Sequence, residues 1–397
     1  MTNSLNQSQS TCHIQVEMQV DAVVVGGGVV GSCAAYSLVQ AGKRTLLLDQ
    51  FAVPHALGSS GGKSRITRLA NFGTEYLTPI MADAYKQWVK ISDLVQEELI
   101  SPNPMLVVSR ISNQLKDVAK TLEKCGHTPR WLTPQETNAK YKTRFPENFH
   151  ILEDPTAGTM RADRCILAVQ KLYRSLGGVV LDRWPVTHVK PGRPWIKISG
   201  PRGSVRARSL VLCPGPWAQQ LLEPLGIQLP LRSIRTKSFY WKNSDFPNAS
   251  FVDISEEPDD FYALPSLSDP GHVKAGFHGG LEATPGGGEP NLSFLREKST
   301  SYFNKYFPFS EKEPYSEDTC WYTVTPDNEF ILDRHPQHDN VVYAVGFSGT
   351  GFKTAPTVGN ILADMVLGRD PAIDVSFFRS ARVTKSSAGD SSLKSKI

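Results

Sequence analysis

A glycine-rich turn near the N-terminus, between a predicted strand and a predicted helix, constrains the fold more than any other feature. Residues 21–25 (DAVVV) form a short apolar run rich in β-branched side chains, which is typical of a buried parallel strand. The pattern G-x-G-x-x-G follows, and residues 29–41 predict a helix with small side chains on one face. Residues 44–49 (RTLLLD) predict a second strand. Together they make a βαβ unit of about thirty residues, the size of a dinucleotide-binding motif.

Each glycine of this motif has a physical task. Gly26 permits a tight turn, Gly28 allows the backbone to approach a pyrophosphate, and Gly31 lets helix and strand pack closely. Asp49, at the end of the second strand, places a carboxylate where it can accept hydrogen bonds from ribose hydroxyls and would repel a 2′-phosphate. The motif therefore favours FAD or NAD over NADP. It does not choose between a flavin and a nicotinamide, and a glycine-rich turn in an unrelated α/β protein is the alternative.

Composition and charge narrow the class of protein. The chain has 397 residues, enough for two domains, and 43 Lys and Arg against 39 Asp and Glu give a net charge of only +4. So small a surplus does not describe a nucleic-acid-binding protein. The six cysteines include no C-x-x-C pair and the nine histidines no H-E-x-x-H, so we expect no metal site and a reducing compartment. The chain contains no uninterrupted apolar run of about twenty residues, so we expect no membrane span.

The rest of the chain alternates between helical and strand-like periods. Helices are predicted over 79–100, 114–124, 163–176 and from about 351 to 367. Strands are predicted over 205–213, 229–241, 271–277 and 341–346. Residues 282–291 (EATPGGGEPN) predict a loop.

Four longer segments form more specific patterns than the glycines. They are residues 58–68 (GSSGGKSRITR), the pattern Y-x-x-P…K-x-x-x-H within 262–278, residues 320–327 (CWYTVTPD) and residues 346–353 (GFSGTGFK). In the same order they resemble G-S-x-H-G-x-x-R-I-x-R, Y-x-x-P…K-x-x-x-H, C-x-Y-T-x-T-P-D and G-F-S-G-x-G-F-K of the monomeric sarcosine oxidase family. The resemblance is closest to the peroxisomal sarcosine/L-pipecolate oxidase branch and covers about residues 20–370.

The resemblance implies an α/β fold with a Rossmann-like FAD-binding domain and an α+β substrate domain that has a mixed or antiparallel sheet. The FAD-binding domain would be discontinuous and consist of residues 18–100, 158–228 and 318–372. The substrate domain would consist of residues 101–157 and 229–317. We expect a disordered N-terminus over residues 1–17 and a C-terminal tail over residues 373–397.

The resemblance also implies FAD as the cofactor, attached covalently through the sulfur of Cys320, which matches the family's attachment position. Such a bond would prevent cofactor loss and make the flavin easier to reduce. We expect the other five cysteines to be ordinary thiols. Arg65 resembles the family arginine next to the flavin, where it would support negative charge on the reduced ring. The other expected cofactor contacts are Gly26, Gly28, Gly31, Asp49, Ser59, Gly349 and Gly351.

Substrates of the family have a carboxylate and a secondary amine. Arg68 and Lys353 match the carboxylate clamp, in which a guanidinium bonds the carboxylate bidentately and an ammonium adds a point charge. Lys274 resembles the lysine that activates oxygen, since a fixed cation stabilises the charge that develops on O2. The expected remaining pocket residues are Tyr322, which would contact substrate, and Tyr262 and His278, which would assist catalysis. The alternative for this histidine is a satisfied core residue.

The implied reaction is FAD-dependent oxidation of a secondary-amine amino acid, of the sarcosine or L-pipecolate type, to an imine, with O2 reduced to H2O2. The clamp would orient a neutral amine, so no strong base is required. Gly61 stands where the family usually has histidine, and we expect more room or a water there. This departure leaves the substrate open. The alternatives are an oxidase of another N-substituted or primary-amine amino acid, an NAD-dependent dehydrogenase and a catalytically impaired flavin-binding module.

The last three residues, Ser395-Lys396-Ile397, differ from the peroxisomal address S-K-L by one conservative change. They predict a peroxisomal import receptor as a partner and the peroxisome as the location, with the cytosol as the alternative. An enzyme that makes H2O2 has a reason to lie beside catalase. The other expected partners are a small amino-acid substrate and O2, and we expect no nucleic acid and a monomeric chain.

Overall fold

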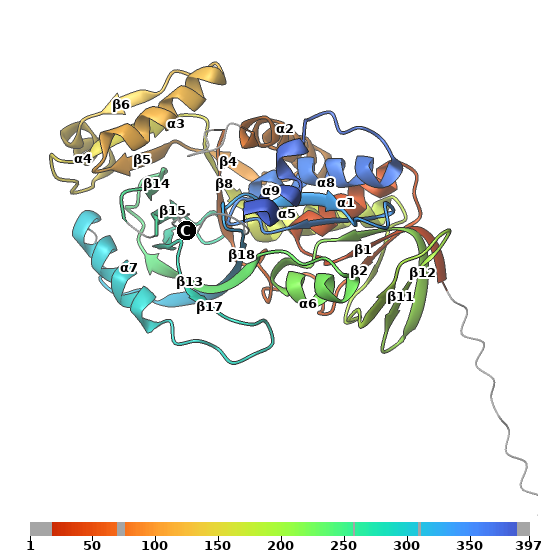
Figure 1. Cartoon of the computed structure of the whole chain (residues 1–397). Coiled ribbons are helices and arrows are strands. Elements are labelled where there is room, and N and C mark those ends of the chain that lie inside the picture. The colour runs from red at the N-terminus through yellow and green to blue at the C-terminus, as the bar shows by residue number, and fades with distance from the viewer. Residues whose placement is uncertain (1–17, 70–75, 257–258, 309–310, 387–397) are drawn as a thin grey trace, which may run out of the picture.

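A computed structural model describes residues 18–69, 76–256, 259–308 and 311–386. Within these ranges the chain forms two large β-sheets and a small one, with helices packed on the faces of the large sheets (Figure 1). The N-terminal segment predicted to be disordered and the predicted import signal lie outside the described residues. Within the described part, no helix combines the length and the apolar character needed to cross a membrane.

The first large sheet has eight strands and a parallel centre. Its strand order is β10-β11-β12-β1-β2-β9, with β20 paired to β12 and β19 paired to β20. The bounds are β1 (Met18–Val25), β2 (Thr45–Leu48), β9 (Val179–Leu181), β10 (His188–Lys190), β11 (Ile196–Gly200), β12 (Gly203–Leu212), β19 (Ile331–Arg334) and β20 (Val341–Val345). The pairs β20–β12, β12–β1, β1–β2 and β2–β9 are parallel, as the predicted βαβ unit requires.

Both faces of this sheet are buried. One face packs against α1 (Val29–Gln40), α2 (Leu77–Val95), α5 (Ala162–Ser175) and α8 (Gly351–Leu367). The other face packs against the short elements α6 (Ala218–Leu222) and η2 (Glu223–Leu225), which follow η1 (Gly215–Trp217). Val23 and Val24 of β1 point to opposite cores, since successive side chains of a strand alternate. This explains the continuous apolar run that predicted a parallel strand.

The second large sheet has nine strands and lies beside the first (Figure 1). Its order is β17-β13-β16-β15-β14-β5-β7-β6, and β18 pairs with β13. The bounds are β5 (Met105–Ser109), β6 (Arg130–Leu132), β7 (His150–Asp154), β13 (Arg232–Lys242), β14 (Ser250–Asp253), β15 (Phe261–Pro265), β16 (His272–Phe277), β17 (Leu281–Glu282) and β18 (Ser316–Val324). Only β14–β5 is parallel, so the sheet is mixed as predicted.

Helices cover parts of this second sheet, and a small sheet links it to the first. The helices are α3 (Ser112–Lys124), α4 (Pro134–Tyr141) and α7 (Ser293–Tyr306). An aromatic core lies under α7, where Trp241 of β13 stacks on Phe303 with ring centroids 4.4 Å apart. The small sheet has the order β3 (Ser64–Thr67), β8 (Gly158–Arg161), β4 (Ile100–Pro102).

Two elements bear on the predicted domain boundaries. Strand β18 was expected to begin the last part of the FAD-binding domain at residue 318, but it pairs along its whole length with β13 of the second sheet. The boundary between the sheets therefore falls after Val324. Within the predicted tail, η3 (Ser376–Phe378) and α9 (Ala381–Ser386) pack on the first sheet. Phe378 is fully buried and its ring stacks on Phe330.

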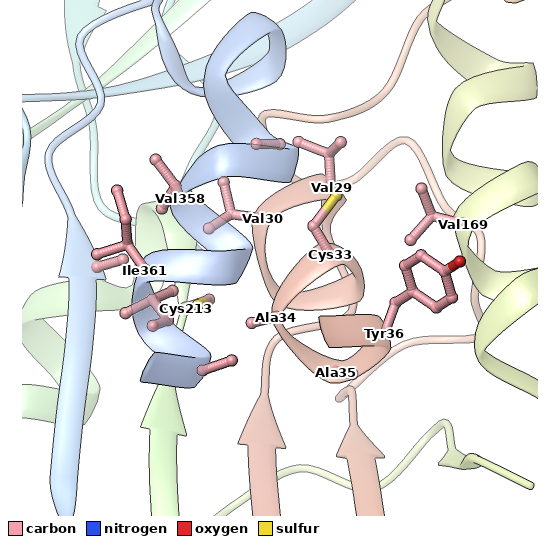
Figure 2. Close-up of a cluster of buried hydrophobic side chains, with 14 of the residues drawn as sticks. Val29, Val30, Cys33, Ala34, Ala35, Tyr36, Val169, Cys213, Val358 and Ile361 are labelled. Atoms are coloured by element: carbon pink, nitrogen blue, oxygen red, sulfur yellow. The ribbon is translucent and has the colours of Figure 1, made fainter. Parts of the chain in front are cut away.

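Close packing of α1 and α8 brings the N-terminal ends of two helices to the same region. Figure 2 shows Val30 and Ala34 of α1 beside Val358 and Ile361 of α8. The approach depends on Gly359, where a β-carbon would lie 2.6 Å from the carbonyl carbon of Cys33. Backbone atoms cannot move aside as the end of a flexible side chain can.

We therefore predict that Gly359→Ala destabilises the protein. Alanine favours a helix interior by about 1 kcal/mol over glycine, but overpacking here costs about 1–3 kcal/mol, so the second effect outweighs the first. Thermal unfolding of the variant should begin at a lower temperature than in the wild type. Gly288→Ala, in open space, is the matched control. A variant as stable as the wild type would mean that α1 and α8 are further apart.

Candidate active site

A cavity of about 520 Å³ lies between the two large sheets. Its volume falls in the range of small-molecule sites, roughly 300–1,000 Å³. Every site residue that the sequence predicted lines this one cavity: Gly26, Gly28, Gly31, Asp49, Ser59, Arg65, Arg68, Tyr262, Lys274, His278, Cys320, Tyr322, Gly349, Gly351 and Lys353. The fold thus brings together side chains from segments hundreds of residues apart.

The glycine turn forms one end of the cavity. Gly26 has a φ of +104°, and a β-carbon there would lie 2.2 Å from the carbonyl oxygen of Cys213. A β-carbon on Gly31 would lie 1.9 Å from the carbonyl oxygen of Gly26. Both positions therefore require glycine, one for its backbone conformation and both for space. Ser60 was not predicted, yet its Oγ accepts a hydrogen bond of 3.0 Å from the backbone N–H of Val29 at the start of α1.

Asp49 lies at the end of β2, and the structure orients its carboxylate. One oxygen, Oδ2, accepts a hydrogen bond of 2.7 Å from the N–H of Gly27, and Oδ1 accepts one of 2.8 Å from the N–H of Phe51. His55 Nε2 lies 3.2 Å from Oδ1. The ring hydrogen lies on Nε2 because Nδ1 accepts the N–H of Leu57. His55 lines the cavity too, and no sequence pattern pointed to it.

The residues present fit a flavin dinucleotide. The glycine turn and the first turn of α1 offer backbone N–H groups to a pyrophosphate. Further along the cavity, Ser64 Oγ and Thr323 Oγ1 are buried without a hydrogen-bond partner among the described residues. Buried polar atoms normally have partners, so these two atoms are suited to a polar ligand. The described residues contain no cluster of His, Cys, Asp and Glu side chains that could hold a metal.

Cys320 faces the cavity from β18. Its thiol is partly buried and lies 3.7 Å from the carbonyl oxygen of Ser59, in the loop before β3. Cys33 and Cys165 are fully enclosed in the apolar core, where burial raises the pKa of each thiol. Burial also raises the pKa of Cys213, to about 12. High pKa values make these three thiols poor nucleophiles.

Four cations surround the other end of the cavity, and burial opposes the charge of three of them. Burial lowers the pKa of Arg68 to about 10, although Asp154 and Asp260 act in the opposite direction. Burial and the neighbouring Arg68 hold the pKa of Lys353 well below its ordinary value. Burial and Arg65 lower the pKa of Lys274 to about 7. A cavity with several desolvated cations favours an anionic ligand, because the anion would stabilise their charged forms.

Arg65 is held in place by the backbone. Its guanidinium donates to the carbonyl oxygens of Ser64, Ser59 and Gly61, which surround the turn before β3. Its charge lies over the ring of Phe352, 5.6 Å from the centroid. These contacts orient one cation of the cavity without neutralising it.

Aromatic and imidazole side chains complete the wall. The Tyr322 hydroxyl lies 3.0 Å from His278 Nδ1, and the Tyr262 hydroxyl lies 2.8 Å from Ser238 Oγ. Burial, with the nearby cations adding to its effect, lowers the pKa of His278 to about 3. The imidazole is therefore neutral at physiological pH and can accept or donate a hydrogen bond without adding charge.

Gly61 does not leave the extra room that the sequence predicted. A β-carbon on Gly61 would lie 2.6 Å from the Cα atom and 2.9 Å from the Cβ atom of Ala56. The segment that contains Ala56 therefore fills the space next to Gly61. The expectation of a vacant space or a water at this position was wrong because a neighbouring loop, not the missing side chain, decides the volume.

We predict that Gly61→His disturbs the site instead of restoring a family feature. The new side chain must displace Ala56, an overpacking effect that costs about 1–3 kcal/mol. Thermal unfolding should show lower stability than in the wild type. Gly58→Ala in the same segment is the control, since its β-carbon would make only an ordinary contact of 3.7 Å with His55. Equal stability of the Gly61 variant and the wild type would show that the loop adapts freely.

The amino-acid sequence of the chain matches one protein family and several known proteins. The family model described as FAD dependent oxidoreductase matches residues 21–365. The chain is 35% identical over 379 residues to the peroxisomal sarcosine oxidase of Homo sapiens, with 91% of this chain and 96% of that protein covered. It is 30% identical over 372 residues to the monomeric sarcosine oxidase of Bacillus sp. (strain B-0618), with 90% and 95% covered.

Solved structures share the fold. NikD in its open form, an unusual amino acid oxidase essential for nikkomycin biosynthesis, matches with a TM-score of 0.82 at 22% identity, covering 91% of this chain and 98% of that chain. L-proline dehydrogenase from P. horikoshii matches with a TM-score of 0.80 at 19% identity, covering 94% and 99%. At these identities the likeness concerns the fold.

Proposed function

The chain belongs to the FAD dependent oxidoreductase family, and from this premise we propose that it oxidises a secondary-amine amino acid of the sarcosine or L-pipecolate type. The products are an imine and H2O2, with O2 as the electron acceptor. One observation supports this proposal most directly. The cations Arg68, Lys353 and Lys274 line the same cavity as a neutral His278. An NAD-dependent dehydrogenase is inconsistent with the family.

Arg68 and Lys353 bind the substrate carboxylate in this proposal. The two cations reach the cavity from different parts of the chain, and burial disfavours the charged form of each, so an added anion is favoured there. The carboxylate therefore gains two charge-assisted hydrogen bonds and fixes the orientation of the rest of the substrate.

The amine end lies among groups that add no charge. His278, Tyr262 and Tyr322 are neutral at physiological pH, because burial lowers the pKa of the imidazole and raises the pKa of both phenols. The surrounding cations disfavour an ammonium group, so the substrate amine binds in its neutral form. A neutral amine has the lone pair that oxidation of the adjacent carbon requires.

FAD supplies the two-electron acceptor when bound. The residues that would hold it are the glycine turn with Gly26, Gly28 and Gly31, then Asp49, Ser59, Gly349 and Gly351, all of which line the cavity. Arg65 would stabilise negative charge on the ring, and Lys274 would stabilise the charge that develops on O2.

We propose that Cys320 links the cofactor covalently. Formation of a carbon–sulfur bond from a thiol and a ring methyl group releases two electrons and two protons, which O2 can accept. The support is the position of this partly buried thiol on the cavity wall, together with the family match of its segment.

The peroxisome is the proposed location, with the import receptor as a partner through Ser395-Lys396-Ile397. The peroxisomal sarcosine oxidase of Homo sapiens, 35% identical, supports it. The cytosol remains the alternative for a chain whose signal ends in isoleucine.

Cys320→Ala should abolish covalent attachment. After acid denaturation, the intact mass of the wild type should exceed that of the polypeptide by one FAD, whereas the variant should have the polypeptide mass alone. Cys213→Ala is the matched control, since Cys213 also lines the cavity and should not alter the attachment. An unmodified wild-type mass, or attachment that survives in the Cys320 variant, contradicts the proposal.

Lys353→Met should weaken substrate binding more than turnover. Loss of one hydrogen bond to a charged group costs about 1.5–3 kcal/mol, so the KM for sarcosine or L-pipecolate should rise by roughly tenfold to a hundredfold. The measurement is H2O2 production against substrate concentration, together with anaerobic bleaching of the flavin. Lys63→Met, at an exposed lysine paired with Asp269, is the control. If no secondary or primary amino acid bleaches the wild type, the flavin-binding-module alternative is favoured.

A further inference from the structure

The carboxylate of Asp318 lies near the cations Lys274 and Arg65, and it has no role in the proposed oxidation. We infer that Asp318 is a positioning residue that keeps Lys274 charged and oriented beside the cofactor cavity, and thereby sets the pH range in which O2 is reduced. The inference rests on the proposed oxidase function. Asp318 does not line the cavity itself, so it acts through Lys274 and not on the substrate.

The register of three strands places Asp318 and Lys274 on the same face of the second sheet. Asp318 of β18 lies opposite Ser238 of β13, and Lys274 of β16 lies opposite Tyr240 of β13. Ser238 and Tyr240 are two residues apart, so their side chains point to the same side of the sheet. Strand pairing therefore fixes the common face of the two residues, whose strands flank β13.

Gly62 provides the space in which the charges meet. A β-carbon on Gly62 would lie 3.2 Å from Arg65 Nη1, 3.6 Å from Asp318 Oδ2 and 3.7 Å from Lys274 Nζ. Gly62 has a φ of +88°, a conformation that favours glycine over other residues. One anion and two cations thus surround a point that is free of any side chain.

Tyr240 fixes the carboxylate in this arrangement. Its hydroxyl donates a hydrogen bond to Asp318 Oδ2. Burial and the adjacent carboxylate hold the pKa of Tyr240 far above its ordinary value, so the phenol remains a donor. A hydrogen bond from a neutral donor orients Asp318 without cancelling its negative charge.

The groups around Lys274 act on it in opposite directions. Burial is the largest effect and lowers its pKa, and the positive charge of Arg65 adds to this, whereas a free Cys320 thiolate and Asp318 oppose it. A Cys320 sulfur bonded to the cofactor carries no charge, so Asp318 is then the opposing group. The Lys274 Nζ also lies 3.4 Å from the carbonyl oxygen of Ser64. The other titratable groups facing this region are Tyr240 of β13, Tyr262 of β15 and His278 after β16.

The pKa of Lys274 lies close to physiological pH, so its charge is sensitive to its neighbours. A lysine with a pKa of about 7 is only partly protonated at neutral pH, so one nearby carboxylate changes the charged fraction substantially. The ammonium form stabilises the negative charge that develops on O2, and the neutral amine does not. Both electrons come from the reduced cofactor, and Asp318 transfers neither electrons nor protons.

The test compares Asp318→Asn, Asp318→Glu and Lys274→Met with the wild type. Substrate-reduced enzyme is mixed rapidly with O2 between about pH 6 and pH 9, and flavin absorbance reports reoxidation. In the wild type the rate should fall as the pH rises through the pKa of Lys274. In Asp318→Asn the fall should occur about one pH unit lower, with reoxidation roughly tenfold slower on the alkaline side. Asp318→Glu should restore most of the rate, and anaerobic reduction by substrate should be unchanged.

An equilibrium measurement provides a readout independent of turnover. The absorbance of the oxidised flavin in the resting enzyme is titrated with pH in the absence of substrate. We expect a transition in the wild type that is absent in Lys274→Met and displaced to lower pH in Asp318→Asn. Glu282→Gln is the control, because this exposed carboxylate of the same sheet is paired with Arg232 and should leave the titration unchanged.

The outcomes separate the inference from the function on which it rests. If Asp318→Asn has the same reoxidation rates and the same pH titration as the wild type, while Lys274→Met is slow to reoxidise, the inference about Asp318 is overturned and the proposed oxidase function is not. Wild-type reoxidation in Lys274→Met overturns the proposed role of the lysine as well. If Asp318→Asn does not fold, Tyr240→Phe removes the hydrogen bond that orients the carboxylate and should shift both profiles in the same direction. Unshifted profiles in that variant contradict the inference.

Discussion

The two faces of the nine-stranded sheet must be buried against different neighbours, and the position of the site depends on this requirement. Along β13, Phe239 and Trp241 enter the aromatic core under α7, whereas Tyr240 between them belongs to the opposite face. Strands β16 and β18 pair with β13 in register, so Lys274 and Cys320 share that opposite face. A slip of one residue would exchange core and site side chains. The same alternation therefore specifies both the packing and the chemistry.

Desolvation governs the electrostatics of the cavity. Arg68, Lys353 and Lys274 are held where burial disfavours their charge, and the nearby carboxylates of Asp154 and Asp260 oppose this effect at Arg68. Such sites are costly in the empty protein and gain most when an anion binds. The same burial keeps His278 neutral. A carboxylate-bearing substrate with a neutral amine matches this distribution of charge.

The sequence predicted helices and strands correctly where their local residue pattern agrees with their long-range contacts. The βαβ unit and the helix after residue 350 were predicted correctly, because hydrophobic periodicity and glycine positions determine them locally. It gave no prediction for the pairing of β18 with β13, which joins residues about eighty positions apart in the chain. It failed at Gly61, where Ala56 of a neighbouring loop fills the space. Neither contact has a local signature.

By itself, the sequence determined the dinucleotide turn, the residue types of the site and the family, because each of these depends on short contiguous segments of the chain. Only the tertiary structure decided that β3, β16, β18 and α8 bring those segments to one cavity. It also revealed His55 beside Asp49, and Asp318 with Tyr240 near Lys274. The physical reason is that strand register and burial are properties of distant pairings. A side chain's charge, partners and volume depend on what these pairings place around it.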